Sequence, residues 1–143
     1  MKFWDSSAIV PLLCTESETH AMLELYGADP SMLVWALTRT EIISALCRRH
    51  REGAIARREL SEAKTRLNQL ESDWTENSDY RSVQERAARL LELHPLSAAD
   101  ALQLAGALVA VEERTSGFGF ITLDARLGEA AAREGFDVVG AVP

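Results

Sequence analysis

Four acidic residues stand where apolar segments of this sequence begin or end: Asp5, Glu41, Asp100 and Asp124. Asp5 follows the short run Lys2-Phe3-Trp4, and Asp124 follows the apolar stretch 118–123. Glu41 and Asp100 lie near the starts of apolar helical patterns. Carboxylates beside a hydrophobic core are costly unless they are capped, paired or bound to cations. If the fold gathers these four, they form an oxygen-rich site suited to Mg²⁺ or Mn²⁺.

Such a cluster suits metal-assisted hydrolysis of phosphodiesters, because a cation polarises the phosphate and lowers the pKa of a bound water. This chemistry needs no side-chain nucleophile. Ser6 or Ser7 as a hydrolase nucleophile would require a glycine-flanked turn and a histidine partner, and the sequence around them offers neither.

Each acid also has a simpler structural interpretation. Asp5 and Asp124 could cap the helices that follow them, and Glu41 could be a surface residue favoured by the helix dipole. Asp100 could reach back to a Ser97 cap. Asp100, however, shares its helix face with apolar residues such as Leu104, so a buried carboxylate there needs donors or a cation nearby.

The elements that must position these acids alternate between strand and helix patterns. Met32–Trp35 is a continuous apolar run of strand length, as expected for a strand that is buried on both faces. Strands are expected at 2–5, 32–35, 118–123 and 137–142, with a weaker signal at 73–78. Helices are expected at 8–13, 17–27, 37–51, 55–73, 79–93, 97–114 and 125–134.

This alternation predicts an α/β fold in which helices cover both faces of a parallel sheet. The length of 143 residues and the absence of a linker, repeat or low-complexity segment predict a single domain over residues 1–143. Ligands of open parallel sheets bind at the carboxyl ends of the strands. Asp5 and Asp124 occupy such positions.

Composition restricts the class of protein. Apolar residues make up 47% and charged residues 26% of the chain, as in a globular protein that folds in water. The sequence shows neither a membrane span nor a signal peptide. Cys14 and Cys47 lack metal-ligand spacing, so we expect free thiols and a cytoplasmic location.

The net charge of −7 argues against a protein that grips nucleic acid through its overall field. The positive charge is uneven, because Arg48, Arg49 and Arg51 cluster around His50. This cluster is compatible with a solvated helix end that complements the dipole, and equally with a patch that contacts phosphates.

The four acids and their flanking residues resemble the PIN-domain ribonucleases, specifically the VapC-type toxins of toxin–antitoxin modules. The matching segments, which stand in the order of the family, are 3–8, 40–46, 96–105 and 120–127, that is FWDSSA, TEIISAL, LSAADALQLA and FITLDARL.

The resemblance implies a three-layer α/β/α sandwich and divalent-metal-dependent endoribonuclease activity on RNA. It carries the catalytic quartet onto Asp5, Glu41, Asp100 and Asp124, with Asp5, Asp100 and Asp124 as metal ligands. Ser6 and Thr122 would hold carboxylates or bound water. The cofactor would be Mg²⁺ or Mn²⁺, and the partners would be an RNA substrate, a VapB-type antitoxin and a second copy of the chain in a homodimer.

One departure and several alternatives remain. Many relatives carry a further acid or Asn near the fourth acid, where this chain has Ala125 and Arg126, so one or two metals are both compatible with the sequence. An aspartyl phosphatase would need an Asp at position 7, where Ser7 stands, and a receiver domain would need a late lysine. A PIN-like binding module without catalysis is the non-enzymatic alternative.

The helices expected at 37–52 and 55–73 suggest a docking surface. Leu60, Ala63, Leu67 and Leu70 follow one another at helical spacing. Their apolar stripe predicts a groove between the two helices that receives an antitoxin segment, unless the stripe packs within the domain.

Overall fold

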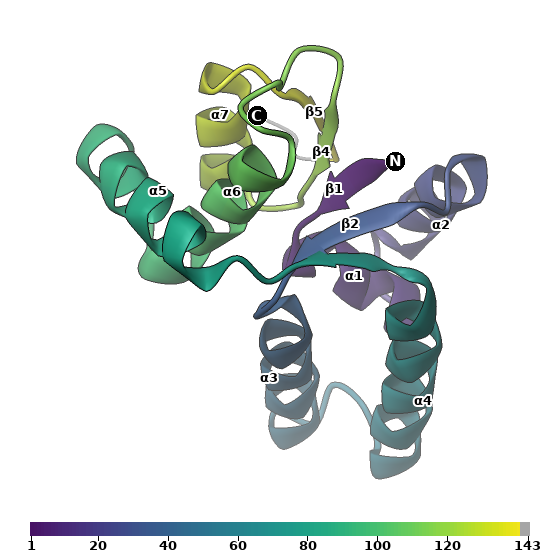
Figure 1. Ribbon diagram of the computed structural model, residues 1–143. Helices are drawn as coiled ribbons and strands as arrows, with labels where there is room; N and C mark the ends of the chain where they lie inside the picture. The colour runs from purple at the N-terminus through teal and green to yellow at the C-terminus, as the bar shows by residue number, and fades with distance from the viewer. Residues whose placement is uncertain (141–143) are drawn as a thin grey trace.

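The computed structural model describes residues 1–140, whose centre is a five-stranded, all-parallel sheet (Figure 1). Its strand order is β3-β2-β1-β4-β5. Phe3 of β1 pairs with Leu33 of β2 on one side and with Phe120 of β4 on the other. The strands are β1 (Lys2–Trp4), β2 (Met32–Trp35), β3 (Thr75–Asn77), β4 (Gly119–Ile121) and β5 (Asp137–Val139).

Seven helices are described, and they cover both faces of this sheet, so the protein is the expected α/β/α sandwich (Figure 1). One layer consists of α5 (Tyr80–Leu93), α6 (Ala98–Ala110) and α7 (Ala125–Arg133). The other layer contains α1 (Ser6–Leu13), α2 (Thr19–Ala28), α3 (Thr38–Arg51) and α4 (Arg57–Asp73).

Alternation along the strands divides the apolar side chains between two cores. Successive side chains of a strand point to opposite faces. Phe3 therefore packs with the α5–α6–α7 layer, while Trp4 packs with the α1–α4 layer. Leu33 and Val34 of β2 separate in the same way. Because both faces are buried, these strands read as continuous apolar runs in the sequence.

The close approach of α6 to β2 depends on one glycine. A Cβ atom built on Gly106 would lie 2.6 Å from the Cβ of Trp35. The backbone oxygen of Gly106 also accepts a 3.0 Å hydrogen bond from Asn77 Nδ2 at the end of β3. This contact fixes α6 over the sheet, with its N-terminal turn at the carboxyl ends of the strands.

The sequence-based elements all exist in the structure, and their ends differ by a few residues. α6 stops at Ala110 rather than at 114, because Glu112 and Glu113 adopt φ angles of 53° and 63° that no helix continues. β5 ends at Val139, and Gly140 turns the chain with φ 98°. The remainder of the expected strand 137–142 lies outside the described residues.

The prediction of an apolar groove along the α4 stripe is wrong for its central members. Ala63 and Leu67 are 0% exposed and pack with Ile42 and Leu46 of α3. Leu60 and Leu70 are partly buried against the same core. The stripe is covered because α1 packs against both α3 and α4, which two isolated helices in the sequence do not reveal.

The state of the two cysteines agrees with the expectation. Cys14 and Cys47 are free thiols, the first buried and the second half-buried. Across residues 1–140, the helices are too short or too polar to cross a membrane.

Candidate active site

The four acids come from elements that end or begin at one edge of the sheet. Asp5 directly follows β1, and Asp124 follows the neighbouring strand β4 and caps α7. Glu41 lies in the first turn of α3 and Asp100 in the first turn of α6. The chain leaves β1 for β2 on one side and reaches β4 on the other. The site therefore lies at the switch point where open α/β sheets bind ligands.

Asp5 is the most enclosed of the four and is held by hydroxyl groups. It is 3% exposed. Its Oδ2 accepts a 2.9 Å hydrogen bond from Thr122 Oγ1 and a short one from Ser7 Oγ, while Ser6 Oγ lies 3.4 Å from Oδ1. Ser7 Oγ also accepts from the backbone N–H of Leu123 at 3.0 Å, which ties the end of β1 to the end of β4.

Glu41 is held by a residue that sequence reasoning did not select. Gln103 is 0% exposed on α6, and its Nε2 donates a short hydrogen bond to Glu41 Oε2. The same amide nitrogen lies 3.2 Å from Thr38 Oγ1, which is also buried. A glutamine on the apolar helix three residues after Asp100 was a visible signal. Ser7 was likewise not selected as a residue that holds Asp5, and its position two residues after Asp5 was the signal.

Asp124 and Asp100 combine a local structural contact with a place in the site. Asp124 Oδ1 accepts a 2.9 Å hydrogen bond from the backbone N–H of Leu127 and caps α7. The N–H of Asp100 donates to the Ser97 cap at 3.2 Å. The capping interpretation is therefore confirmed for Asp124, whose charge also acts on Asp5 and Asp100.

The four carboxyl groups influence one another's ionisation. Burial, opposed by the hydroxyl hydrogen bonds and reinforced by Asp124, raises the pKa of Asp5. Burial and the charges of Asp124 and Asp5 raise the pKa of Asp100. Burial, together with Asp5 and Asp100, raises the pKa of Glu41 to about 7 despite the hydrogen bond from Gln103. Like charges disfavour one another's ionised forms.

The donor set fits a hard divalent cation, although the side chains are not arranged around a common point. Carboxylate oxygens are the ligands that Mg²⁺ and Mn²⁺ prefer, and a cation would relieve the repulsion that raises these pKa values. Within residues 1–140, however, no three acidic, histidine or cysteine groups are placed to hold one ion. Asp5, Glu41 and Asp124 each direct an oxygen to a hydrogen-bond donor of the protein.

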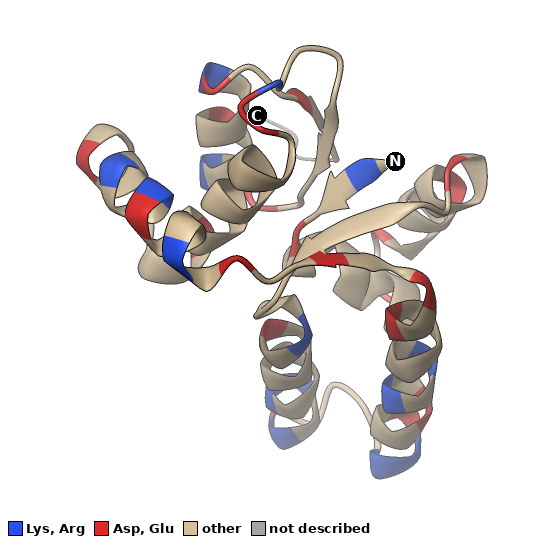
Figure 2. Cartoon of the chain, in the orientation of Figure 1, with Lys and Arg blue, Asp and Glu red and all other residues tan. Residues whose placement is uncertain are grey.

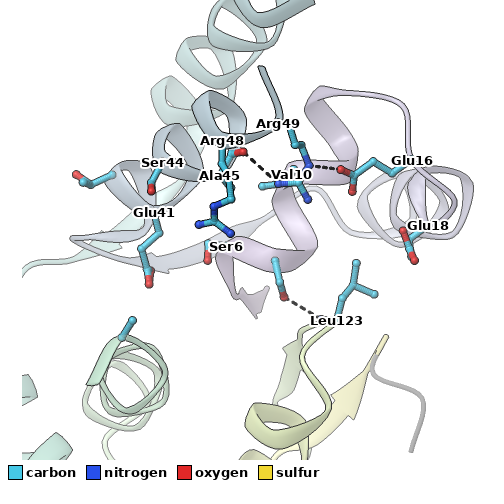
Figure 3. A pocket seen from close by; sticks show the side chains of 13 residues that line it. Ser6, Val10, Glu16, Glu18, Glu41, Ser44, Ala45, Arg48, Arg49 and Leu123 are labelled. Atoms are coloured by element: carbon cyan, nitrogen blue, oxygen red, sulfur yellow. Dashed lines mark hydrogen bonds and ion pairs between the residues drawn. The ribbon is translucent and has the colours of Figure 1, made fainter. Parts of the chain in front are cut away.

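A cavity of about 690 Å³ opens beside the acids (Figure 3). Its lining comes from α1, from Glu16 and Glu18 before α2, and from one face of α3. Ala99 and Leu123, which adjoin Asp100 and Asp124, complete it. Glu41 lies at one end of this lining, and Arg48 and Arg49 come from further along α3. The site is therefore open to a ligand much larger than a water molecule.

A sequence model of one protein family, the PIN domain, matches residues 2–133. The chain belongs to the PIN family. Nuclease activity is typical of this family, and its members typically use divalent metal ions. The PIN match spans all four acids, all seven described helices and strands β1 to β4, and it ends with α7, before β5.

Solved structures show the same fold at low sequence identity. A toxin–antitoxin complex from Klebsiella pneumoniae superposes with a TM-score of 0.61 at 20% identity, covering 88% of each chain. FitAcB from Neisseria gonorrhoeae gives a TM-score of 0.66 at 15% identity, covering 96% of each chain. PAE2754 from Pyrobaculum aerophilum gives a TM-score of 0.59 at 19% identity, and the match covers 99% of this chain and 87% of the PAE2754 chain. No protein with a curated description matches the sequence significantly.

Proposed function

We propose that this PIN-family protein is a divalent-metal-dependent endoribonuclease of the VapC type, the toxin of a type II toxin–antitoxin system. The observation that carries the proposal is the convergence of four carboxyl groups at the switch point of a PIN sheet, where burial and mutual repulsion raise three of their pKa values. Such a concentration of negative charge serves no packing purpose and is relieved by a cation.

In this proposal Asp5, Asp100 and Asp124 hold Mg²⁺ or Mn²⁺. When bound, the ion would polarise the scissile phosphate and supply an activated water. Thr122 keeps Asp5 in place through the 2.9 Å hydrogen bond to Oδ2. Ser6 Oγ makes a weaker, 3.4 Å contact with the other oxygen of Asp5, Oδ1.

Glu41 has a different role in the proposal. A carboxyl group whose pKa is about 7 can accept or release a proton at neutral pH. Glu41 also lines the cavity, so its carboxyl group can reach a ligand bound there. With a cation held by the other acids, Glu41 would be ionised, and its carboxylate would be placed to accept a proton from water in the site.

The test is RNA cleavage by wild type and by Asp5→Asn and Asp124→Asn, each with magnesium, manganese or a chelator. Asn keeps the shape of the side chain but removes its charge, so both variants should lose cleavage while their circular dichroism stays native. Asp137→Asn is the matched control, because Asp137 is exposed on β5. Cleavage that survives in both site variants, or that ignores the chelator, would overturn the proposal.

The side-chain arrangement at the site favours one alternative, a PIN-like binding module without catalysis. No three of the ligand-type side chains in residues 1–140 surround one point, as expected if the scaffold only binds. In that case wild type would bind RNA or a partner and cleave nothing with any divalent metal. A phosphatase or receiver-type phosphate-transfer domain would instead release or accept phosphate from a small phosphoester, which the same preparations can test.

We further propose a VapB-type antitoxin and a second copy of the chain as partners in the cytoplasm. The structural likeness to a chain of a toxin–antitoxin complex supports an antitoxin. The apolar surface suited to it is a hollow of about 260 Å³ between α1, α2 and α4, with Leu23 49% exposed at its rim. An antitoxin arginine in the acidic site would compete with the cation electrostatically. Size-exclusion chromatography with light scattering tests the homodimer.

A further inference from the structure

One face of α3 presents polar groups to the cavity in a regular order. Thr40, Ser44 and Arg48 are spaced four residues apart, so they lie along the same side of the helix, and all three line the cavity. Ala45 lines it between them and has a small side chain. The face therefore leads from Thr40 and the Glu41 carboxyl group in the first turn, past the Ser44 hydroxyl group, to the Arg48 guanidinium. Arg48 lies about 10 Å beyond Glu41 along the helix axis, at 1.5 Å per residue.

Arg48 and Arg49 line the same cavity but differ in what they contact. Arg49 forms a short ion pair with Glu16 and donates to the carbonyl oxygen of Ala45 at 3.2 Å. Arg48 is exposed and has no hydrogen bond or ion pair with any of residues 1–140. In Figure 3 its guanidinium is turned into the cavity, between Glu41 and Ser6 in that view. Among the described residues that line the cavity, Arg48 is thus the cation that no acidic side chain compensates.

Positive charge continues from Arg48 toward the end of α3 and the start of α4. Figure 2 shows basic residues gathered where α3 ends and α4 begins, at the tip of the helical pair. The opposite rim of the cavity carries Glu18, which is exposed and would repel a phosphate. With a net charge of −7, the chain cannot attract an RNA strand through its overall field. Local contacts must therefore select the path of the strand.

We propose that Arg48 binds a backbone phosphate of the RNA strand next to the scissile phosphate, and that the strand runs along the Thr40–Ser44–Arg48 face of α3. This inference rests on the proposed ribonuclease function and says along which side of the acidic site the RNA strand lies. A guanidinium matches phosphate oxygens with two parallel N–H donors. The Ser44 hydroxyl group lies between the two positions and supplies a further donor for a ribose oxygen, and the Thr40 hydroxyl group supplies one beside Glu41.

The experiment compares Arg48→Gln with Arg51→Gln in RNA cleavage. Arg51 lies in the same last turn of α3 and is exposed, but it does not line the cavity, so its variant controls for the lost charge. We expect Arg48→Gln to raise KM for a single-stranded oligoribonucleotide about three- to tenfold with little change in kcat. The slope of log KM against log salt should fall by about 0.7, the value for one phosphate of a single strand. Arg48→Lys, which keeps the charge, should recover part of the loss.

The outcomes separate this inference from the proposed function. If wild type cleaves RNA and Arg48→Gln behaves like Arg51→Gln, the inference fails and the ribonuclease function stands. If wild type cleaves nothing, fluorescence anisotropy with the same oligoribonucleotide at low salt in chelator decides the matter. Weaker binding by Arg48→Gln than by Arg51→Gln would then support the groove without catalysis, and an absence of wild-type binding would overturn both. Arg48 bound to an acidic segment of a protein partner would leave RNA cleavage unchanged, which also overturns the inference.

Discussion

Replacing Glu41 with Gln removes a charge from the site without removing its main contact. The Gln103 amide donates to Glu41 Oε2, and the amide oxygen of a glutamine at position 41 can accept the same hydrogen bond. The side chains have nearly the same volume. The variant therefore isolates the cost of keeping a negative charge beside Asp5 and Asp100.

The magnitude follows from the pKa of Glu41, which is about 7 in the folded protein against an ordinary 4.5. Since the folded state holds its proton more tightly than the unfolded state, folding is favoured below about pH 4.5, and this contribution is lost as the pH rises to about 7. A shift of this size corresponds to at most about 3.4 kcal/mol, at 1.36 kcal/mol per pKa unit. Because Glu41 is only partly buried and its neighbours also titrate, we expect about 1–3 kcal/mol.

The assay is urea unfolding in chelator at a series of pH values between 4 and 8. Glu41→Gln should match wild type near pH 4 and exceed its free energy of unfolding by about 1–3 kcal/mol at pH 8. Glu92→Gln removes the same charge from an exposed position on α5 and controls for net charge. Parallel wild-type and Glu41→Gln curves across the range would refute the reasoning, because they would place Glu41 outside the acidic cluster.

Three further predictions test the site and the fold. In thermal melts, magnesium or manganese should stabilise wild type through mass action, by about 2.7 kcal/mol at a metal concentration of 100 times Kd. The same metal should stabilise Asp100→Asn much less. Equal responses of the two proteins would remove Asp100 from the metal site. Leu67→Ala should lower the free energy of unfolding by about 2–5 kcal/mol, because Leu67 is 0% exposed. Leu23→Ala, at a side chain that is 49% exposed, should change it by about 0.5 kcal/mol or less. Similar losses in the two variants would contradict the packing of α4. Arg86→Met should cost about 2–4 kcal/mol at pH 7, because the Arg86 side chain is 12% exposed and ion-pairs with Glu134 at 2.9 Å. That cost should shrink in acid, since the hydrogen bonds of Glu134 to His94 and Arg86 outweigh its burial and lower its pKa; a cost that is independent of pH would show that the ion pair contributes nothing.

Local sequence predicted the elements well where pattern and end signals agree. The run 32–35 was predicted as a strand and is β2, because a strand buried on both faces must be apolar throughout. Asp5, Ser97 and Asp124 accept hydrogen bonds from the first turns of α1, α6 and α7. Helix ends were less predictable where backbone conformation decided them, as at Glu112 and Glu113 after α6.

Contacts between residues that lie far apart in the sequence could not be predicted from the same local patterns. The α4 stripe carries the signal of an amphipathic helix, but only the position of α1 decides that Leu67 belongs to the core rather than to a partner surface. In the same way, nothing in the sequence around Gln103 shows which residue its amide contacts. Its contact with Glu41, 62 residues away, exists only because α6 and α3 lie close together in the fold.

The sequence by itself determined the α/β alternation and the places of four carboxylates at element ends, because strand burial, helix caps and periodicity are local properties of the chain. Only the tertiary structure decided that Asp5 and Asp124 follow neighbouring strands and that Ser7 and Thr122 hold Asp5. It also decided that Arg48 faces the cavity without an ion-pair partner among residues 1–140. The physical reason is that strand order and helix packing depend on how two separate hydrophobic faces are covered, and that choice involves the whole chain at once.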